Sequence, residues 1–529
     1  MSLRNRFVLP IIFSSLAILG ACGGGGISHV IPPPPTGNFT NSDLNGTYVF
    51  SVTGSDSGFG FLTMVGTLTA DGNGGISGGT MDLNDPLVTA PVTNLPITGG
   101  SYSITADGRG QATLSAATPF ATSVVVDFVL SSSSHGLITE FDSAGTGSGT
   151  IDLQSAVTQS QIAGSYAFNT TGVSVNSTGA QTSFAAVGAF TLDANGNVTT
   201  GVEDFNDDST SVGLSNLAIT GGSVSLATVP GLATLTTSEG TFTFDVYPID
   251  STHLKFIEID SLPIMAGDAF TQSSSIPTGA NVFTVAGLDF TVQGPFTAAG
   301  LIVTDGAGLV TSASAEDIND AGVAAKVTGF TGSYTAVTGG RAVLTLSNFA
   351  NGNSGGTGNY QFAAYPSSGG VQLLEIDNVG VTAGVAYPQT STTLASSGSY
   401  GFNLAGINSN GEEEDDIAQF TNNSGSFTGF IDFNDLGATS YGLSFASSYA
   451  ADSTIPSRGV ISPTNNAFNL VSYIVDSSTA VFVEVDSGQV GLGSFGVQAS
   501  AAKSNAAAAH LAALRTSKPG KMSARRKTK

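Results

Sequence analysis

The chain has 529 residues, of which 40% are hydrophobic, 10% are charged and 69 are glycine. This length gives room for about three to five domains of ~100–150 residues each, and the apolar content excludes a disordered chain. Only five basic residues accompany the 39 acidic residues between residues 38 and 500. Since such an acidic body repels nucleic acid and anionic lipid surfaces, we expect no nucleic-acid partner.

The first 21 residues have the layout of a signal peptide. Arg4 and Arg6 precede an apolar run from Phe7 to Leu19, which is too short and too early in the chain to span a membrane. The run leads into Leu19-Gly20-Ala21-Cys22, which resembles the lipobox of bacterial lipoproteins. The resemblance implies that the Cys22 thiol receives a diacylglyceryl group and becomes the mature N-terminus. The alternative is an ordinary cleaved secretory signal followed by an incidental cysteine.

Residues 22–37 form a spacer, with glycines at 23–26 and prolines at 32–35. Glycines make a linker flexible and prolines extend it, so we expect a tether that holds the next domain off the membrane. Two or more acyl chains anchor a protein stably. By resemblance to lipoproteins of two-membrane bacteria, Gly23 in place of Asp after the cysteine implies the outer membrane. Cys22 is the only cysteine in the sequence, which excludes an intramolecular disulfide.

One unit of about 115 residues then recurs, and repetition of this kind determines the architecture. Each copy opens on Gly-x-x-x-Phe, as in Gly46–Phe50, and closes on Gly-x-x-x-x-Gln, as in Gly149–Gln154. Near the start of the first copy Tyr48, Phe50 and Val52 recur at every second position, which predicts a strand with one aromatic face buried. The predicted repeats are residues 38–158, 159–275, 276–392 and 393–500.

Every copy carries an Asp-x-Asn-Asp motif after a hairpin turn, which in the first copy is Asp71-Gly72-Asn73-Gly74. Asp, Asn and Gly supply the positive φ that such turns require. The motif is therefore interpreted as a structural turn, as a source of oxygen ligands for Ca²⁺, or as a recognition site. We expect no cofactor apart from calcium under the second interpretation. The motif residues are Asp82, Asn84, Asp85, Asp204, Asn206, Asp207, Asp317, Asn319, Asp320, Asp432, Asn434 and Asp435.

A Glu-x-Asp motif ends a later strand in every copy and places both carboxylates on one strand face. Paired carboxylates can hydrolyse glycosides, but an active site seldom needs four copies. The flanking residues are apolar, so a half-buried Glu there needs a partner. We predict one stabilising ion pair per copy. The predicted pairs are Glu140 with Arg109, Glu258 with Lys255, Glu375 with Arg341, and Glu484 with Arg458.

We expect an all-β chain of four tandem antiparallel meander domains, each with about eight strands linked by tight turns. Such strands fit an up-and-down barrel, which leaves no unpaired sheet edge; the alternative is a β-sandwich. The first copy resembles avidin-type and lipocalin-type meander barrels at Gly46-Thr47-Tyr48, residues 69–74 and Gly78-Gly79-Thr80. Avidin-like sites use Trp contacts with biotin and this chain has no Trp, so the resemblance supports a topology and not biotin binding.

Two histidines, His135 and His253, occupy matching turns of the first two copies, but the sequence has no Cys/His cluster for zinc. Residues 501–529 add an Ala-rich and basic tail. These features predict a lipid-anchored cell-envelope protein that is not an enzyme and presents β-domains for binding, adhesion or scaffolding. Its partner would be a glycan, a small ligand or a protein. The alternatives are a glycoside hydrolase that uses the Glu-x-Asp carboxylates and a calcium-dependent adhesion module.

Overall fold

The computed structural model describes residues 37–499, apart from 87, 89, 209–212, 352–355, 378, 466 and 467. The chain divides into two compact units, Met1–Pro34 and Pro35–Lys529, and all described residues belong to the second. The predicted signal peptide, Cys22, the tether up to residue 36 and the tail 501–529 lie outside the described residues. In the part that the structure describes, no helix is long and apolar enough to cross a membrane.

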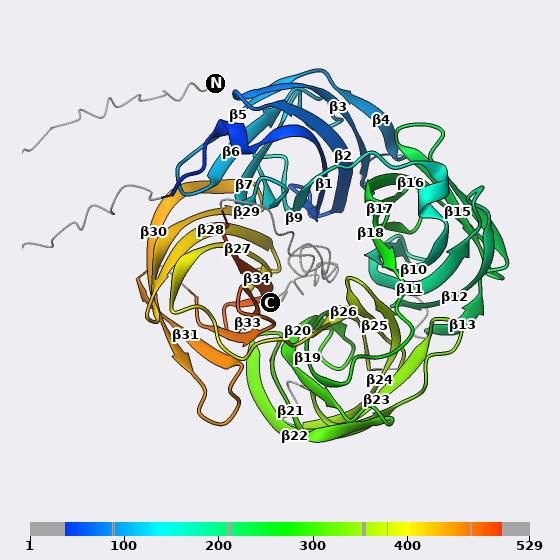
Figure 1. Ribbon diagram of the computed structural model, residues 1–529, viewed down its shortest axis with the longest axis vertical. Helices are drawn as coiled ribbons and strands as arrows, with labels where there is room; N and C mark the ends of the chain where they lie inside the picture. The colour runs from blue at the N-terminus through cyan, green and yellow to red at the C-terminus, as the bar shows by residue number, and fades with distance from the viewer. Residues whose placement is uncertain are drawn as a thin grey trace, which may run out of the picture. The chain divides into compact units, whose positions relative to one another are not determined.

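The described residues form an all-β fold with 34 strands and two short 3-10 helices. The strands make four antiparallel meander sheets, which follow one another along the chain from blue to red in Figure 1. We call these sheets modules 1 to 4. Each lies within one of the predicted sequence repeats. The prediction of tandem antiparallel meanders is confirmed, and the sheets close into barrels in modules 1, 3 and 4 rather than pairing as sandwiches.

Module 1 is a closed barrel with one additional strand. Its first strand pairs with the second and the ninth, and the second pairs with the third, which closes the sheet. The fourth strand pairs with the later part of the third. The elements are η1 (Asn41–Asp43), β1 (Asn45–Asp56), β2 (Phe61–Asp71), β3 (Gly75–Asn84), β4 (Val92–Ile97), β5 (Gly100–Ile104), β6 (Arg109–Leu114), β7 (Val124–Ser132), β8 (His135–Phe141) and β9 (Gly145–Leu153).

Module 2 keeps the same order of strands but its sheet stays open. Module 1 closes where β3 pairs with β5; at the matching place in module 2, one isolated bridge between Asn197 and Ser223 joins the start of β12 to β14 in the described residues. This opening departs from the barrel prediction. The elements are η2 (Gln159–Ile162), β10 (Gly164–Val175), β11 (Gln181–Leu192), β12 (Val198–Asp207), β13 (Leu214–Ala218), β14 (Gly221–Ser225), β15 (Gly231–Thr236), β16 (Thr241–Asp250), β17 (His253–Glu258) and β18 (Ile264–Thr271).

Modules 3 and 4 are closed eight-stranded barrels. Module 3 consists of β19 (Gly279–Asp289), β20 (Gly294–Thr304), β21 (Leu309–Asp320), β22 (Val323–Tyr334), β23 (Ala342–Asn351), β24 (Gly356–Ser367), β25 (Gly370–Glu375) and β26 (Gly380–Pro388). Module 4 consists of β27 (Ser397–Asn408), β28 (Glu413–Asn423), β29 (Ser426–Asp435), β30 (Ala438–Ala451), β31 (Arg458–Asn465), β32 (Leu470–Ile474), β33 (Thr479–Glu484) and β34 (Gln489–Val497).

The first strands of the modules are buried on both faces. Tyr48, Phe50 and Val52 fill the interior of module 1, as the alternation predicts. Val49, on the opposite face of the same strand, is buried against Tyr247 of module 2. Strands covered on both sides favour continuous apolar runs over strict alternation. The outer faces of the barrels are therefore packing surfaces between modules.

Side chains fill the barrel interiors. In module 3 the ring of Phe349 lies 5.0 Å from that of Tyr360 and 5.4 Å from that of Phe330. In module 4 the interior contains a cavity of about 30 Å³ lined mainly by phenylalanines, a space for only one or two water molecules. Small barrels are commonly packed in this way. The interior of module 4 therefore has no room for a ligand of sugar size.

We predict that Phe349→Ala lowers the free energy of unfolding by roughly 3–5 kcal/mol, because a fully buried aromatic ring leaves a cavity. Leu309→Ala is the matched control in the same module: its side chain is 56% exposed, and we expect a change within about 0.5 kcal/mol. Chemical denaturation monitored by tyrosine fluorescence measures both. Equal effects of the two substitutions would contradict this description of the core.

Candidate functional site

The Asn of each Asp-x-Asn-Asp motif contacts the Glu-x-Asp motif of the next module. Its side-chain amide donates to the main-chain carbonyl of the motif's Glu, at 2.8 or 2.9 Å in all four cases. The fourth module contacts the first, so the contacts form a closed cycle. We call each contact region a joint. The pairs are Asn84 with Glu258, Asn206 with Glu375, Asn319 with Glu484, and Asn434 with Glu140.

Each asparagine amide meets more than one carbonyl. Asn319 Nδ2 also lies 3.0 Å from the carbonyl of Asp486 and 2.8 Å from that of Gln489. The amide thus satisfies buried acceptors at the end of one strand and the start of the next, where the chain turns. Buried backbone groups left without a partner are costly. The Asn side chain therefore donates hydrogen bonds to carbonyls of the next module that have no partner within their own turn.

The first Asp of the motif is the second contact at each joint. Asp204 accepts hydrogen bonds from the Tyr365 hydroxyl and, at 2.7 and 2.8 Å, from the Arg341 guanidinium, both in module 3. Asp317 accepts in the same way from Tyr473 at 2.6 Å and from Arg458 at 2.6 and 2.7 Å. Joints 2–3 and 3–4 therefore share one arrangement of a carboxylate, a phenol and a guanidinium.

Burial sets the protonation states of these groups. It raises the pKa of Tyr473 well above its ordinary value, and the negative charge of Asp317 raises it further. Burial alone would lower the pKa of Arg458, but its hydrogen bond and charge pairing with Asp317 give a net increase. The tyrosine stays a neutral donor and the arginine stays a cation, and both donate hydrogen bonds to the carboxyl group of Asp317.

Each of the two remaining joints lacks one of the three side chains: joint 1–2 lacks the arginine and joint 4–1 lacks the tyrosine. At joint 1–2, Asp82 accepts from the Tyr247 hydroxyl at 2.7 Å, but module 2 has Gly231-Leu232 in place of the arginine. Burial raises the pKa of Asp82. At joint 4–1, the guanidinium Nη1 of Arg109 lies 3.3 Å from both oxygens of Asp432, and Val129 stands six residues before His135, where Tyr247 stands six before His253.

A local irregularity in the sheet presents the first Asp to the joint. The pairing of β12 with β13 shifts between Glu203 and Phe205, which leaves Asp204 outside the regular ladder. Opposite the shift, Asn216 has a φ of 61° and donates its main-chain N–H to Asp204 at 2.9 Å. β-Bulges commonly redirect side chains in this way. The same shift flanks Asp82 in module 1.

The carboxyl group of the Glu in Glu-x-Asp is buried and lacks the predicted basic partner. Burial raises the pKa of this Glu well above its ordinary value in every module, and the neighbouring Asp of the motif raises it further. Burial therefore favours the neutral form of these side chains. The Asp of the motif binds main-chain amides within its own module; Asp142 accepts from Val125 N at 2.9 Å and Asp377 from Gln361 N at 2.7 Å.

The predicted ion pairs are corrected by this arrangement. Arg341 and Arg458 pair with Asp204 and Asp317 of the preceding module, rather than with Glu375 and Glu484. Arg109 pairs with Asp107 and Asp432 rather than with Glu140, and Lys255 pairs with Asp268 at 3.0 Å rather than with Glu258. A carboxylate that already accepts hydrogen bonds attracts a guanidinium more strongly than a buried Glu whose raised pKa favours the uncharged form.

The last Asp of each Asp-x-Asn-Asp motif lies at the end of its strand. Asp85, Asp207 and Asp320 are buried there, and Asp435 is half-buried and accepts from Asn408 Nδ2 at 3.1 Å. Within the described ranges, no group of three or more His, Cys, Asp or Glu side chains is arranged to hold a metal ion. The calcium interpretation of the motif therefore gains no support from its geometry.

The Gln that closes the repeats is a third joint residue, which the sequence pattern marked without assigning a contact. Gln154 Nε2 donates to the carbonyl of Pro248 at 2.8 Å across joint 1–2. Gln389 donates to Ile474 at 2.6 Å across joint 3–4, and Gln498 donates to Leu130 at 2.9 Å across joint 4–1. The joint tyrosines Tyr247, Tyr365 and Tyr473 were also not predicted from the sequence, although a Tyr recurs at this position in three copies.

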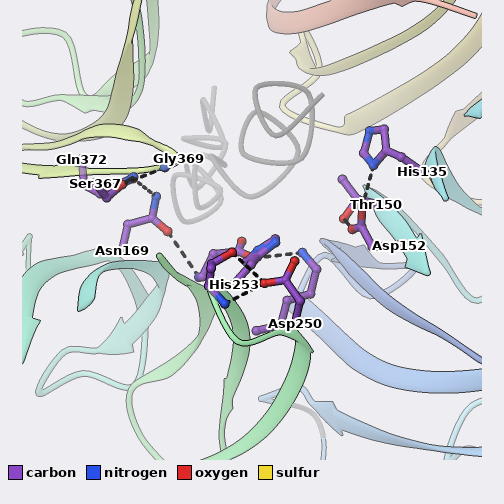
Figure 2. A network of polar contacts seen from close by, with 12 residues as sticks. His135, Thr150, Asp152, Asn169, Asp250, His253, Ser367, Gly369 and Gln372 are labelled. Atoms are coloured by element: carbon purple, nitrogen blue, oxygen red, sulfur yellow. Dashed lines mark hydrogen bonds and ion pairs between the residues drawn. The ribbon is translucent and has the colours of Figure 1, made fainter. Parts of the chain in front are cut away.

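A polar network outside these contacts extends over modules 1, 2 and 3 (Figure 2). His135 Nδ1 lies 2.6 Å from Asp152, and Lys255 Nζ and His253 Nε2 lie 3.0 and 2.6 Å from Asp268. Burial works to raise the pKa of Asp152, but His135, Lys255 and His253 lower it overall. The groups of modules 1 and 2 are thus electrostatically coupled.

Amide side chains continue this network into module 3. Asn169 Nδ2 donates to Gln372 Oε1 at 2.7 Å, and Gln372 Nε2 donates to Ser367 Oγ at 3.1 Å. Figure 2 shows the His253 group between the Asn169 and Gln372 side chains and the His135–Asp152 pair. His135 Nε2 is buried and has no hydrogen-bond partner among the described residues. His135 and His253, which occupy matching turns of modules 1 and 2, therefore take part in one polar network.

No family model and no curated protein matches the chain. Among solved structures, a double mutant of Transferrin Binding Protein B from Haemophilus parasuis Hp5 is similar at 9% identity, with 90% of this chain and 97% of that chain covered and a TM-score of 0.16. The intact Ap-TbpB with its N and C lobes is similar at 8% identity, with coverage of 91% and 98% and a TM-score of 0.15. At these TM-scores the similarity supports no conclusion about fold or function.

We predict that Asn319→Ala destabilises the protein by about 1–3 kcal/mol, because three buried carbonyls lose their shared donor. Asn195→Ala, in an exposed turn of module 2, is the control and should stay within about 0.5 kcal/mol. Thermal unfolding measures both variants. A loss no larger than that of the control would show that the asparagine contributes nothing to the joint.

Arg458→Ala should cost roughly 3–5 kcal/mol, because it leaves Asp317 buried without its cation. Lys326→Ala removes the other cation that contacts Asp452, from a side chain that is 32% exposed, so we expect at most about 1 kcal/mol. Denaturant titration of the two variants compares them directly. Similar losses would mean that the buried pair has no special weight.

Proposed function

We propose that this protein is an exported lipoprotein, anchored at the outer membrane of a bacterium through Cys22, and that it binds or scaffolds a partner without catalysing a reaction. The observation that carries the proposal is the use of the repeated acidic motifs. Their Asn and first Asp hold neighbouring modules together. The residues that recur in the sequence therefore make contacts between modules and are not four copies of an active site.

The state of the Glu-x-Asp carboxyls supports a non-catalytic role. A glycosidase needs an acid and a base or nucleophile that both reach the scissile bond. In module 4, Glu484 is buried and burial raises its pKa, which favours its neutral form, while Asp486 accepts the main-chain N–H of Asn469 at 2.8 Å. Two carboxyls occupied in this way are poorly suited to act on a bound sugar.

The packing of the modules indicates where a partner would bind. The filled interior of module 4 argues against capture of a ligand inside the barrel. The outer strands carry exposed apolar side chains, including Leu309 and Val323 in module 3 and Tyr441 in module 4. A protein or glycan would therefore meet the outside of a preformed body, which loses little conformational entropy on binding.

We expect Cys22→Ser to release the protein from the membrane fraction, because the lipid would no longer be attached. Metabolic labelling with radioactive palmitate, followed by fractionation, measures both the label and the location. The unmodified chain should carry the label and sediment with outer membranes. A labelled Cys22→Ser protein, or an unlabelled unmodified protein, would contradict the lipid anchor.

The hydrolase alternative is tested with the same preparations. We expect no turnover of a panel of chromogenic glycosides by the purified chain and no change in Glu484→Gln. Turnover that Glu484→Gln abolishes, while the variant keeps its melting temperature, would replace the proposal with an envelope hydrolase.

A further inference from the structure

The joint between modules 4 and 1 differs from the others because no linker spans it. Short segments join β9 to β10, β18 to β19 and β26 to β27, and so hold the modules at the other three joints close together. A covalent link of this kind gives a high effective concentration of one surface at the other. Joint 4–1 is closed by contacts between the two ends of the folded region alone.

Its buried apolar cluster also has the fewest residues, although the Phe141 and Tyr441 rings add an edge-on contact 6.4 Å apart. At joint 1–2, Val49 and Val65 pack against a buried group that includes Tyr247 and Ile249. A larger cluster connects modules 2, 3 and 4. At joint 4–1 the buried cluster consists of Val129, Leu137 and Ile417. Since hydrophobic stabilisation scales with the apolar area removed from water, this joint depends more on polar contacts than the others do.

An acidic side chain occupies the centre of these polar contacts. Asp415 on β28 accepts hydrogen bonds from Thr146 and Ser148 on β9, at 2.9 and 2.7 Å. Asp415 pairs in the sheet with Asn434. The residues paired with the corresponding asparagines of modules 1, 2 and 3 are uncharged: they are Thr63, Ala185 and Thr297. An ionisable group at this position is therefore specific to the joint that closes the cycle.

The surroundings of Asp415 are strongly acidic. Ser55 Oγ of module 1 contacts Glu413 at 2.5 Å, and Arg109 on β6 is the cation that pairs across the joint. The carboxyl groups that lie at the joint beside Asp415 are Glu413 and Asp432 of module 4 and Asp107 and Asp127 of module 1. Glu414 and Asp416 alternate with Asp415 along β28 and share the interior face of Ala418 and Phe420, and Glu140 shares the interior face of Ile138 in module 1. Full ionisation of this set would place many like charges in a buried seam.

We propose that joint 4–1 is a pH-sensitive latch, closed when Asp415 and Asp127 are protonated and opened as they ionise. Opening would separate the Asp432–Asp435 edge of module 4 from the Glu140–Asp142 turn of module 1 and leave the three linked joints intact. The chain would then change from a closed cycle to an open series of modules. The surfaces released are the ones that hold modules together, so they would become available to a partner.

The direction of the pH dependence follows from the buried acids. Burial raises the pKa of Asp415 to about 8, with Glu414 adding to the increase and the two hydroxyl donors opposing it. Burial likewise raises the pKa of Asp127 to about 8. In the open form these groups would be solvated, with an ordinary pKa near ~4. The closed form thus holds extra protons, so rising pH favours opening between about 4 and 8.

The latch is tested in the full-length chain by energy transfer between dyes on Ser115→Cys in module 1 and Thr439→Cys in module 4, both at exposed positions. Cys22→Ser is included in these chains, so that the dyes react only with the two introduced cysteines. We expect transfer to fall as the pH is raised from 5 to 8.5. Each proton released on opening multiplies the ratio of open to closed chains by about ten per pH unit.

Two variants separate the latch from general unfolding. Asp415→Asn accepts from one of the two hydroxyls through its oxygen and donates to the other through its NH2 group, but removes one titrating group, so the slope of log(open/closed) against pH should fall by about one. Asp127→Asn should lower the slope similarly. Asp305→Asn, in an exposed turn of module 3, is the control and should leave the slope unchanged. Constant transfer across this pH range, or slopes unchanged in both variants, would overturn the proposal.

Discussion

The structure depends on the hydrogen bonds from one side-chain amide in each module to main-chain carbonyls of the next. Asn319, for example, bridges three carbonyls around the turn after β33. The amide has two N–H donors on a short side chain, and the acceptors it meets are buried at a turn where the strand ladder leaves them unpaired. Around this contact the Asp, Tyr and Arg side chains form a charged group, and the closing Gln adds a further donor to a main-chain carbonyl. Because the fourth module makes the same Asn contact with the first, the repeats form a closed cycle instead of an open array.

This cycle changes the functional interpretation of the repeats. In a string of independent domains each copy would offer its own binding site, whereas here the repeated polar residues are occupied between copies. Features that are not repeated then become the candidates for recognition. The network of His135, His253 and Lys255 draws on particular residues of the first two modules, and the acid-rich seam around Asp415 belongs to one joint. The proposed binding or scaffolding role rests on this division between shared contacts and individual ones.

The strands and turns could be predicted from sequence because their signals are local. Alternating apolar residues at Tyr48 to Val52 and the Asp71–Gly74 turn act over a few residues. The partners of the acidic motifs could not be predicted, since Asn434 and Glu140 are 294 positions apart. Reasoning within one repeat favoured nearby Glu residues for the arginines. Burial raises the pKa of Glu375, however, and the carboxylates that pair with Arg341 and Arg458 lie across a joint, on Asp204 and Asp317. The incomplete closure of module 2 also has no local signal, because closure depends on pairing between β12 and β14, which are not consecutive along the chain.

The most direct test of the central claim is calorimetry of a chain in which Asn84, Asn206, Asn319 and Asn434 are all replaced by alanine. If these side chains hold the modules together, the unmodified chain unfolds in one dominant cooperative transition, and the fourfold variant unfolds at lower temperature in several separated transitions, because the modules then melt individually. A circular dichroism spectrum of unchanged β-content would show that the modules themselves remain folded. Several independent transitions in the unmodified chain, unaltered by the four substitutions, would contradict the account.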